Sequence, residues 1–232
     1  MIDRRSFLVS AGAAALAGCT TADPTVVVQR QVAMRPRAAA PVFVPPDVRA
    51  MYGPRPNEEF PLPAADIAQV PPQFWRREVS NPTGEAPGTI VVDTATFYLY
   101  FTQPGGTAMR YGVGLGRQGF TWNGDARIPF KRKWPTWTPP AEMIARDPSL
   151  EEFRDGMAPG LDNPLGARAL YLFQGKADTL YRLHGTMEAK SIGHAVSSGC
   201  VRLLNQDVID LYERVPNGTR VIVRPPSAPR LA

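Results

Sequence analysis

The sequence predicts a mainly β domain with few short helices (an α+β fold of the β-dominated kind), preceded by a proline-rich segment. From about residue 88, short runs rich in β-branched, aromatic and other apolar residues recur, and turn residues separate them. Of the 25 prolines, 13 lie between residues 20 and 87, where no long run keeps a helical or strand period. Only residues 142–153 and 205–214 have the pattern of helices, so the fold is expected to be built around a sheet.

The expected strands fall in the order of the chain, with a hairpin first, because the turn-forming run 93–96 separates two β-rich segments. The helix over 142–153 should be interrupted near Asp147-Pro148, and Asn205 should cap the helix over 205–214. The strands are expected at residues 89–94, 97–101, 109–115, 126–134, 167–173, 179–184 and 219–224.

The first 19 residues have the composition of an export signal. Arg4 and Arg5 precede an apolar stretch at 7–17, which at 11 residues is too short to span a bilayer. The run around the two arginines resembles a twin-arginine motif, and Leu-Ala-Gly-Cys ending at Cys19 resembles a lipobox. We therefore expect residues 1–19 to be a signal peptide with lipidation at Cys19; the alternative is an incidental small residue before an ordinary cleavage site.

Four segments follow from these patterns. After the signal at 1–19, residues 20–87 are expected to form a proline-rich tether and lead-in, with 20–70 extended and 71–87 packed on the domain. Residues 88–224 should form the folded domain, and residues 225–232 a C-terminal tail. A lipid anchor at Cys19 would attach the chain to a membrane and would prevent a disulfide with Cys200, the second of two cysteines.

The charge suits an acidic partner only in a general way. The formal net charge is +5 and the pI is about 9.5. Lysine and arginine are scattered, and no basic run is interleaved with aromatic residues, so nucleic-acid binding is not expected.

A histidine and a cysteine are placed as a nucleophile and its base would be. His184 ends an apolar β segment, and Cys200 follows after a connection of 15 residues, in a loop ahead of the helix at 205–214. A thiol needs a base to become a thiolate, and histidine is the usual one. Gly199 would let a substrate carbonyl approach the backbone, where the amides of Gly199 and Cys200 could bind an oxyanion.

Other motifs have weaker interpretations. The run Gly114-x-Gly116-x-x-Gly119 fits a dinucleotide fingerprint, but no strand–helix–strand unit surrounds it, so a glycine-rich turn is expected. His194 should be a surface residue, and a metal site is not expected because typical ligands are too few. Trp134 and Trp137 either pack in the core or line a substrate cleft.

The runs His184-Gly185-Thr186 and Ser197-Ser198-Gly199-Cys200-Val201-Arg202 closely resemble the signature of the bacterial L,D-transpeptidase catalytic domain (YkuD type). The resemblance covers about 88–224, and the runs 134–140 and 163–170 are similar to the subgroup of Gram-negative envelope enzymes.

The resemblance implies a β-sandwich or barrel domain and a cysteine enzyme that needs no cofactor. Its substrate would be a peptidoglycan tetrapeptide stem, cleaved after meso-diaminopimelate with release of D-alanine. An amine would then resolve the acyl-enzyme: a second stem gives a 3→3 cross-link, and a protein lysine gives wall attachment. Together with the lipobox at Cys19, the resemblance to Gram-negative envelope enzymes leads us to expect a periplasmic lipoprotein anchored in the outer membrane.

The resemblance also assigns roles. Cys200 is the implied nucleophile, His184 the base and the Gly185 carbonyl the third member. The implied oxyanion or substrate-binding residues are Thr186, Ser197, Ser198, Gly199 and Arg202. Many family members have histidine where this chain has Ser198, which weakens any role for a second histidine.

Two other functions stay open at this point. The same thiol acting with water would make an L,D-carboxypeptidase or a peptidoglycan hydrolase. A degenerate site would leave a non-catalytic wall-binding lipoprotein.

Overall fold

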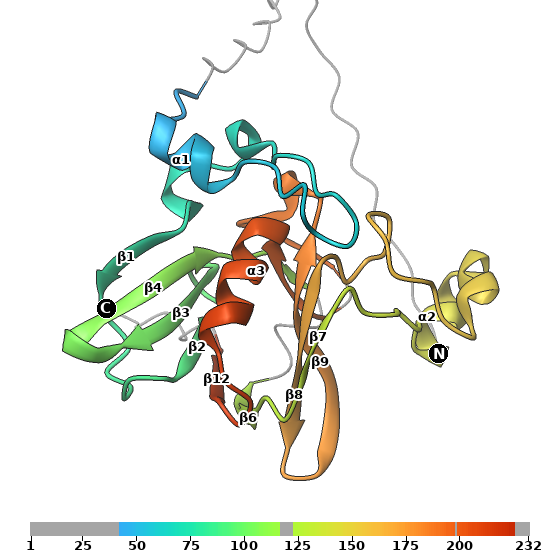
Figure 1. Ribbon diagram of the computed structural model, residues 1–232. Coiled ribbons are helices and arrows are strands. Elements are labelled where there is room, and N and C mark those ends of the chain that lie inside the picture. The colour runs from blue at the N-terminus through green and yellow to red at the C-terminus, as the bar shows by residue number, and fades with distance from the viewer. Residues whose placement is uncertain (1–41, 117–122, 198, 226–232) are drawn as a thin grey trace, which may run out of the picture. The chain divides into compact units, whose positions relative to one another are not determined.

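The computed structural model describes residues 42–116, 123–197 and 199–225 (Figure 1). The expected export signal, the lipidation site at Cys19 and the residues 20–41 lie outside the described residues. So do Gly119 and Ser198.

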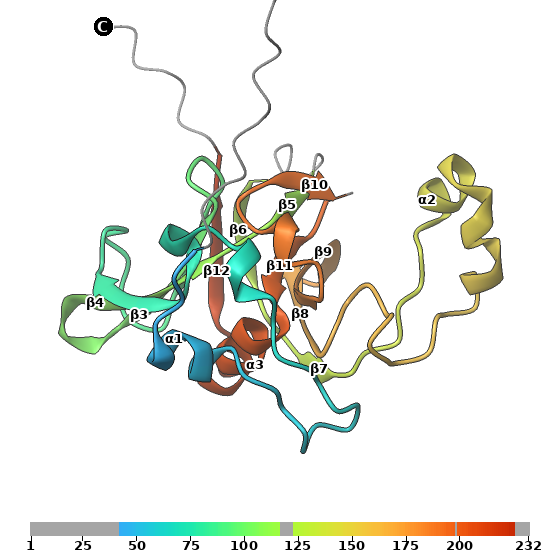
Figure 2. The ribbon, with the colours of Figure 1, turned by 90° about the horizontal axis from the view of Figure 1, so that it is seen from above.

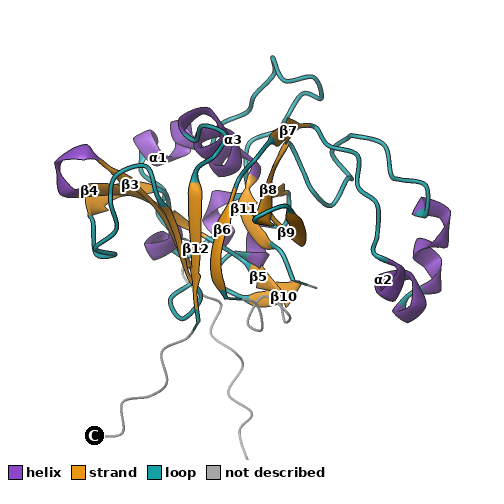
Figure 3. Cartoon of the chain, turned by 90° about the horizontal axis from the view of Figure 1, so that it is seen from below, coloured by secondary structure: helices purple, strands orange, loops and turns teal. Residues whose placement is uncertain are grey.

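One curled sheet forms the centre of the fold, and the mainly β class with few short helices is confirmed (Figures 1 and 3). Among the described residues nine strands follow one another in the order β1-β4-β3-β2-β12-β6-β8-β9-β11, and β7 pairs with β8. Their bounds are β1 Arg77–Ser80, β2 Ile90–Asp93, β3 Tyr98–Gln103, β4 Thr107–Gly112, β6 Gly124–Arg127, β7 Lys131–Lys133, β8 Arg168–Gln174, β9 Ala177–Thr186, β11 Val201–Leu204 and β12 Arg220–Arg224. A second, two-stranded sheet joins β5 (Leu115–Gly116) to β10 (Ala195–Ser197) in parallel.

The strand partners explain why some strands are apolar throughout. The expected hairpin is present as β2 and β3, and β12 pairs in parallel with β2 on its other side. Ile90, Val91 and Val92 of β2 are at most 1% exposed, as expected for a strand covered on both faces. At the other end of the sheet, β9 pairs antiparallel with β8 and parallel with β11.

The helices are short and lie around the sheet. The longest, α3, packs against β8, β9 and β11 with its apolar residues Val208 and Leu211 buried (Figure 1). The α-helices are α1 Pro46–Met51, α2 Ala141–Arg146 and α3 Asn205–Arg214. The 3-10 turns are Ile67–Gln69, Pro72–Phe74, Pro104–Gly106, Pro148–Phe153 and Ala189–Ser191. In the described part of the chain, no helix combines the length and the apolar character needed to cross a bilayer.

Two expected strands are divided. The segment 126–134 forms β6 and β7 with a break at 128–130, where Pro129 has no amide hydrogen to donate to a ladder. The segment 109–115 forms β4 and β5. The helix expected over 142–153 is interrupted at Asp147-Pro148 as predicted, with α2 before the break and a 3-10 turn after it.

The prediction that residues up to 70 form an extended tether is wrong for residues 42–70. These residues carry α1 and bury Tyr52, Ile67 and Val70 in an apolar cluster that also contains Ile192 and Leu204. The prolines interrupt any helical or strand period in this segment, which is why the sequence favoured a tether. The apolar residues between the prolines nevertheless pack against the domain. The packing predicted for 71–87 is seen: Trp75 is buried, and β1 adds a strand beside β4.

Asn205 does not cap α3 with its side chain. The residue at the N-cap is Leu204, and no side-chain capping bond is made. Asn205 is instead buried, and its Oδ1 accepts a hydrogen bond from the Ala167 amide at 2.8 Å. This difference matters for the site, because Asn205 lies directly against Gly185.

Candidate active site

Strand pairing fixes the position of His184. In β9, His184 lies opposite Ala169 of β8 on one side and Arg202 of β11 on the other. Its side chain is only 4% exposed. A residue held between two ladders has little freedom to shift along the sheet, so the imidazole is positioned by backbone hydrogen bonds.

The tautomer of His184 follows from one contact. Nδ1 lies 2.8 Å from the carbonyl oxygen of Gly185, which can only accept a hydrogen bond. Nδ1 therefore carries the hydrogen, and Nε2 is left as the acceptor for a proton. This is the tautomer that a general base for a thiol requires.

Gly185 is a glycine because no side chain fits there. A Cβ atom on Gly185 would lie 2.0 Å from Oδ1 of Asn205, and the Gly185 amide donates to the carbonyl of Leu165 at 3.0 Å. Asn205 thereby packs against the peptide unit whose carbonyl orients His184. Sequence reasoning missed this role of Asn205, and only its place at the start of a helix was a signal.

Cys200 lies immediately before β11, next to the histidine strand. Gly199 has φ 145°, a value that favours glycine. Arg202 and Gly114 exchange two backbone hydrogen bonds of 2.8 and 2.9 Å, so the glycine of the false dinucleotide motif supports the strand that follows the cysteine. A Cβ on Gly114 would lie 2.5 Å from the Ser191 carbonyl oxygen.

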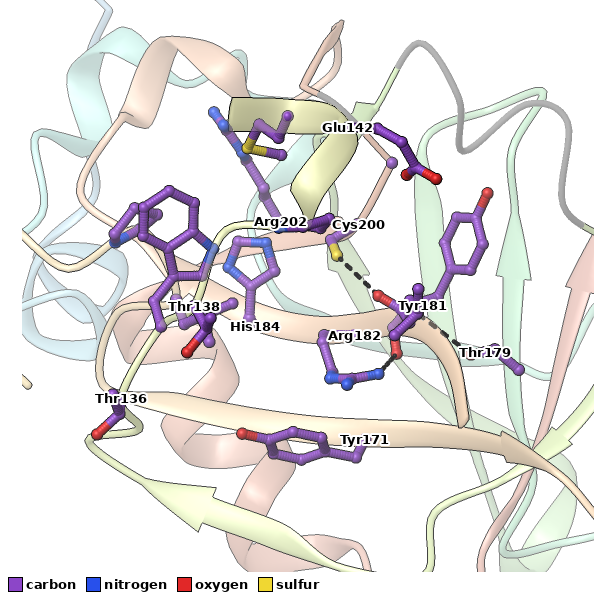
Figure 4. Close-up of a pocket in the computed structure, with 17 residues that line it drawn as sticks. Thr136, Thr138, Glu142, Tyr171, Thr179, Tyr181, Arg182, His184, Cys200 and Arg202 are labelled. Atoms are coloured by element: carbon purple, nitrogen blue, oxygen red, sulfur yellow. Dashed lines mark hydrogen bonds between the residues drawn. The ribbon is translucent and has the colours of Figure 1, made fainter. Parts of the chain in front are cut away.

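The thiol faces an irregular part of β9. Cys200 Sγ lies 3.9 Å from the carbonyl oxygen of Leu180, to which it donates a long hydrogen bond (Figure 4). Leu180 has φ 62°, unusual for a branched residue, and Asp178 Oδ1 accepts a hydrogen bond from its amide at 2.8 Å. The side chain of Leu180 is 65% exposed at the cavity rim. This bulge places a backbone acceptor beside the Cys200 thiol.

His184 and Cys200 line the same cavity, which has a volume of about 600 Å³ (Figure 4). One side is formed by strands β8, β9 and β11 and the loop before β11. The other side is formed by the segment between β7 and β8, which includes α2. The lining residues are Thr136, Trp137, Thr138, Pro140, Glu142, Met143, Pro164, Leu165, Tyr171, Thr179, Leu180, Tyr181, Arg182, His184, Gly199, Cys200 and Arg202.

Burial favours the neutral forms of both His184 and Cys200. It lowers the pKa of His184 to about 4, and the nearby charges of Arg202 and Arg182 act in the same direction. Burial also raises the pKa of the Cys200 thiol above its ordinary value, although Arg182 and Arg202 oppose the shift. At neutral pH the pair therefore rests as a thiol beside a neutral imidazole.

Two arginines give the cavity a positive wall, and they differ in how firmly they are held. Arg182 pairs with both carboxylate oxygens of Asp178 at 2.7 and 2.8 Å and stacks over Tyr171 at 4.3 Å. Arg202 pairs with Glu188, whose side chain is 69% exposed. An exposed ion pair of this kind contributes at most about 1 kcal/mol, so a substrate carboxylate can compete for Arg202.

The other predicted residues are placed differently. Thr186 does not line the cavity; its buried side chain accepts the Glu188 amide at 3.0 Å. Ser197 is the last residue of β10, where it pairs with Gly116 of β5. The exposed position predicted for His194 is seen. No cluster of three or more potential metal ligands occurs among the described residues.

The two tryptophans have one role each. Trp134 is 4% exposed and packs with Leu62 and Ala167, as in the core interpretation. Trp137 lines the cavity, as in the cleft interpretation.

A family model and curated relatives point to the same protein family. Residues 87–223 match the YkuD family model, described as the L,D-transpeptidase catalytic domain. The probable L,D-transpeptidase YbiS of Escherichia coli is 40% identical over 138 residues, which cover 57% of this chain and 43% of that one. The probable L,D-transpeptidase YcfS of the same species is 38% identical over 141 residues, 57% of this chain and 42% of that one. The match thus spans less than half the length of these relatives.

A solved structure from Brucella melitensis, described as a probable carnitine operon oxidoreductase, is 47% identical. The match covers 68% of this chain and 99% of that one, with a TM-score of 0.48. The family assignment depends on the match over residues 87–223. This chain belongs to the L,D-transpeptidase catalytic domain family.

Proposed function

We propose that this chain is an L,D-transpeptidase that acts on peptidoglycan tetrapeptide stems through an acyl-enzyme on Cys200. The observation that carries the proposal is that Cys200 and His184 line one cavity in a member of this family. The Nδ1–Gly185 contact supports it, because Nε2 of His184 is then available to accept a proton.

In the first half-reaction, Sγ of Cys200 attacks the carbonyl carbon of the bond between meso-diaminopimelate and D-alanine, while Nε2 of His184 takes the thiol proton. The carbonyl electron pair moves to oxygen, where the amides of Gly199 and Cys200 would donate hydrogen bonds. Collapse breaks the C–N bond, and His184 returns its proton to the departing amine of D-alanine.

In the second half-reaction an amine attacks the thioester, His184 accepts the amine proton, and the thiolate leaves and is reprotonated. An acceptor stem would give a 3→3 cross-link, and a protein lysine would give wall attachment. Since the resting pair is neutral, proton transfer accompanies attack in this scheme rather than preceding it.

Arg202 is the residue we assign to a substrate carboxylate, because its partner Glu188 is exposed and replaceable. Ser197 and Ser198 are proposed as oxyanion or substrate-binding residues on the sequence motif alone. Thr186 is better suited to supporting the turn after β9 than to binding substrate. We also propose that the chain acts in the periplasm as a lipoprotein anchored through Cys19, on the sequence pattern alone.

The test is incubation of the purified chain with tetrapeptide muropeptides, with products read by mass spectrometry and Cys200→Ala in parallel. Loss of D-alanine together with new dimers, absent in Cys200→Ala, is the expected result. D-alanine loss without dimers would instead identify a carboxypeptidase. Thiol-independent products, or none from any stem peptide, would contradict the proposal.

A further inference from the structure

A loop outside the family-matched region contacts the residues that flank one wall of the cavity. Residues 55–62 precede the match at 87–223 and close on themselves through Arg55 and Leu62, whose backbones exchange hydrogen bonds of 2.8 and 3.1 Å. The loop carries Glu58 and Phe60. In Figure 1 this cyan loop passes beside β7 and the loops at the ends of β8 and β9.

Glu58 makes three charge-assisted contacts. Its two carboxylate oxygens accept from the guanidinium of Arg168 at 2.7 and 2.8 Å, and the indole Nε1 of Trp134 donates to Oε2 at 3.0 Å. Arg168 is 3% exposed and Glu58 is 17% exposed. A buried guanidinium that loses its carboxylate is left as an uncompensated charge, which is strongly unfavourable.

These contacts fall on the two ends of one wall of the cavity. Trp134 directly follows β7, Arg168 begins β8, and the Trp134 amide donates to the Ala167 carbonyl at 2.9 Å. The segment between them, residues 135–166, provides Trp137 and Leu165 to the cavity. Figure 2 shows α2 of this segment set well away from the sheet. Phe60 packs on Trp134 with ring centroids 5.0 Å apart.

We propose that Glu58 is a positioning residue. By binding Trp134 and Arg168, it holds the two ends of the segment 135–166 together and so fixes the position of this segment opposite Cys200. The inference deepens the proposed transpeptidase function and depends on it for the choice of substrate. Arg168 precedes Ala169, the register partner of His184, so the same clamp also supports the histidine strand. Residues 42–76 are on this view part of the catalytic unit.

The experiment uses the full chain with Glu58→Gln, which removes the charge, and Trp134→Phe, which removes the indole donor together with part of the buried ring. Glu85→Gln is the matched control, because Glu85 also pairs with two arginines, Arg220 and Arg224, in a region that contributes no residue to the cavity. Three quantities are measured: amide hydrogen exchange over 135–166, kcat and KM for the tetrapeptide, and the rate of Cys200 alkylation by iodoacetamide.

For Glu58→Gln we expect faster exchange over 135–166 and a KM raised about tenfold, since small displacements of a substrate-positioning wall have effects of this order. Cys200 alkylation should change less than about twofold. Trp134→Phe should show smaller changes in exchange and KM in the same direction. In the double variant Glu58→Gln/Trp134→Phe, the change in KM should be less than the two single effects combined, because both residues belong to one contact. Glu85→Gln should leave all three unchanged.

Unchanged exchange over 135–166 in both Glu58→Gln and Trp134→Phe would overturn the proposal, even if the variants were less stable overall. An equal rise in KM in Glu85→Gln would also overturn it. The exchange measurement does not depend on turnover. If no tetrapeptide is processed, the proposed function fails, while altered exchange confined to 135–166 still supports the clamp.

Discussion

The two sides of the cavity are built differently. On the sheet side, β9 holds His184 between β8 and β11, and Cys200 stands at the start of β11. On the other side, residues 135–166 form no strand of the main sheet. Apart from local turns and helices, two backbone hydrogen bonds between Trp137 and Met157 and the buried Asn163 side chain link the distant parts of this segment.

The difference separates two tasks. Proton transfer needs atoms placed to a fraction of an ångström, which ladders on both sides of β9 provide. Recognition of a long peptide is better served by a wall of loops, which adapts more easily. We therefore expect changes at His184 and at the residues that orient it to lower kcat, and changes on the loop side to raise KM.

The sheet side should give the largest effect. His184→Asn removes the Nε2 acceptor for the thiol proton, and kcat for D-alanine release should fall by about 10³-fold with little change in KM. Steady-state kinetics on tetrapeptide, with thermal unfolding as a control for folding, measures this. A loss of less than tenfold in a normally folded variant would remove His184 from the base role.

A change behind the histidine should be the next largest. Gly185→Ala forces a Cβ atom against Asn205, moves the carbonyl that orients His184 and should lower kcat by about 10²-fold. Adding Asn205→Ala makes room and should restore part of the rate, although Asn205→Ala alone should lower stability by about 1–3 kcal/mol because the Ala167 amide loses its acceptor. If the double variant is no faster than Gly185→Ala, the packing explanation is wrong.

The loop side should show the opposite kinetic pattern. Trp137→Ala removes a large apolar surface from the cavity and should raise KM by about tenfold while kcat changes little. Trp137→Phe should recover most of the affinity. A fall in kcat with unchanged KM would mean that the two sides do not divide the tasks as described.

The smallest expected effect is that of pH. Because burial lowers the pKa of His184 to about 4, the imidazole stays neutral well below its ordinary value of 6.5. As pH falls from 7.5 to 5.5, kcat/KM should decrease by less than about twofold, and the decline should come as pH falls through about 4. The free energy of unfolding should also decrease as pH falls. Between pH 6.5 and about 4 the unfolded chain protonates this histidine while the folded chain does not, so His184 destabilises the fold progressively over that range. A tenfold loss of kcat/KM by pH 5.5 would contradict the buried, neutral histidine.

The sequence was most informative where chemistry and local order coincide. His184, Cys200 and the ends of α3 could be placed because a short motif and a helical period mark them. The buried lead-in could not, since prolines interrupt its periodicity while Tyr52 and Val70 are buried by partners distant in the chain. The Glu58–Arg168 contact joins residues 110 positions apart, and no local sequence pattern predicts a pair at that separation.

Asn205 shows a second limit of sequence reasoning. Its residue type and position predict a helix cap, but its side chain instead fills the space beside Gly166 and Gly185. A tertiary contact here replaced a local preference. The role of Trp137 was also left open by sequence, because aromatic residues serve cores and clefts equally well.

If Cys200 carries the acyl group during turnover, the intermediate can be trapped on this residue. The chain would be mixed with tetrapeptide, quenched in acid within one turnover, and analysed by intact mass and peptide mapping. We expect a tripeptide stem attached to the peptide that contains Cys200, and no such adduct in Cys200→Ala. D-alanine release without any adduct on Cys200, or with the adduct on another residue, would contradict it.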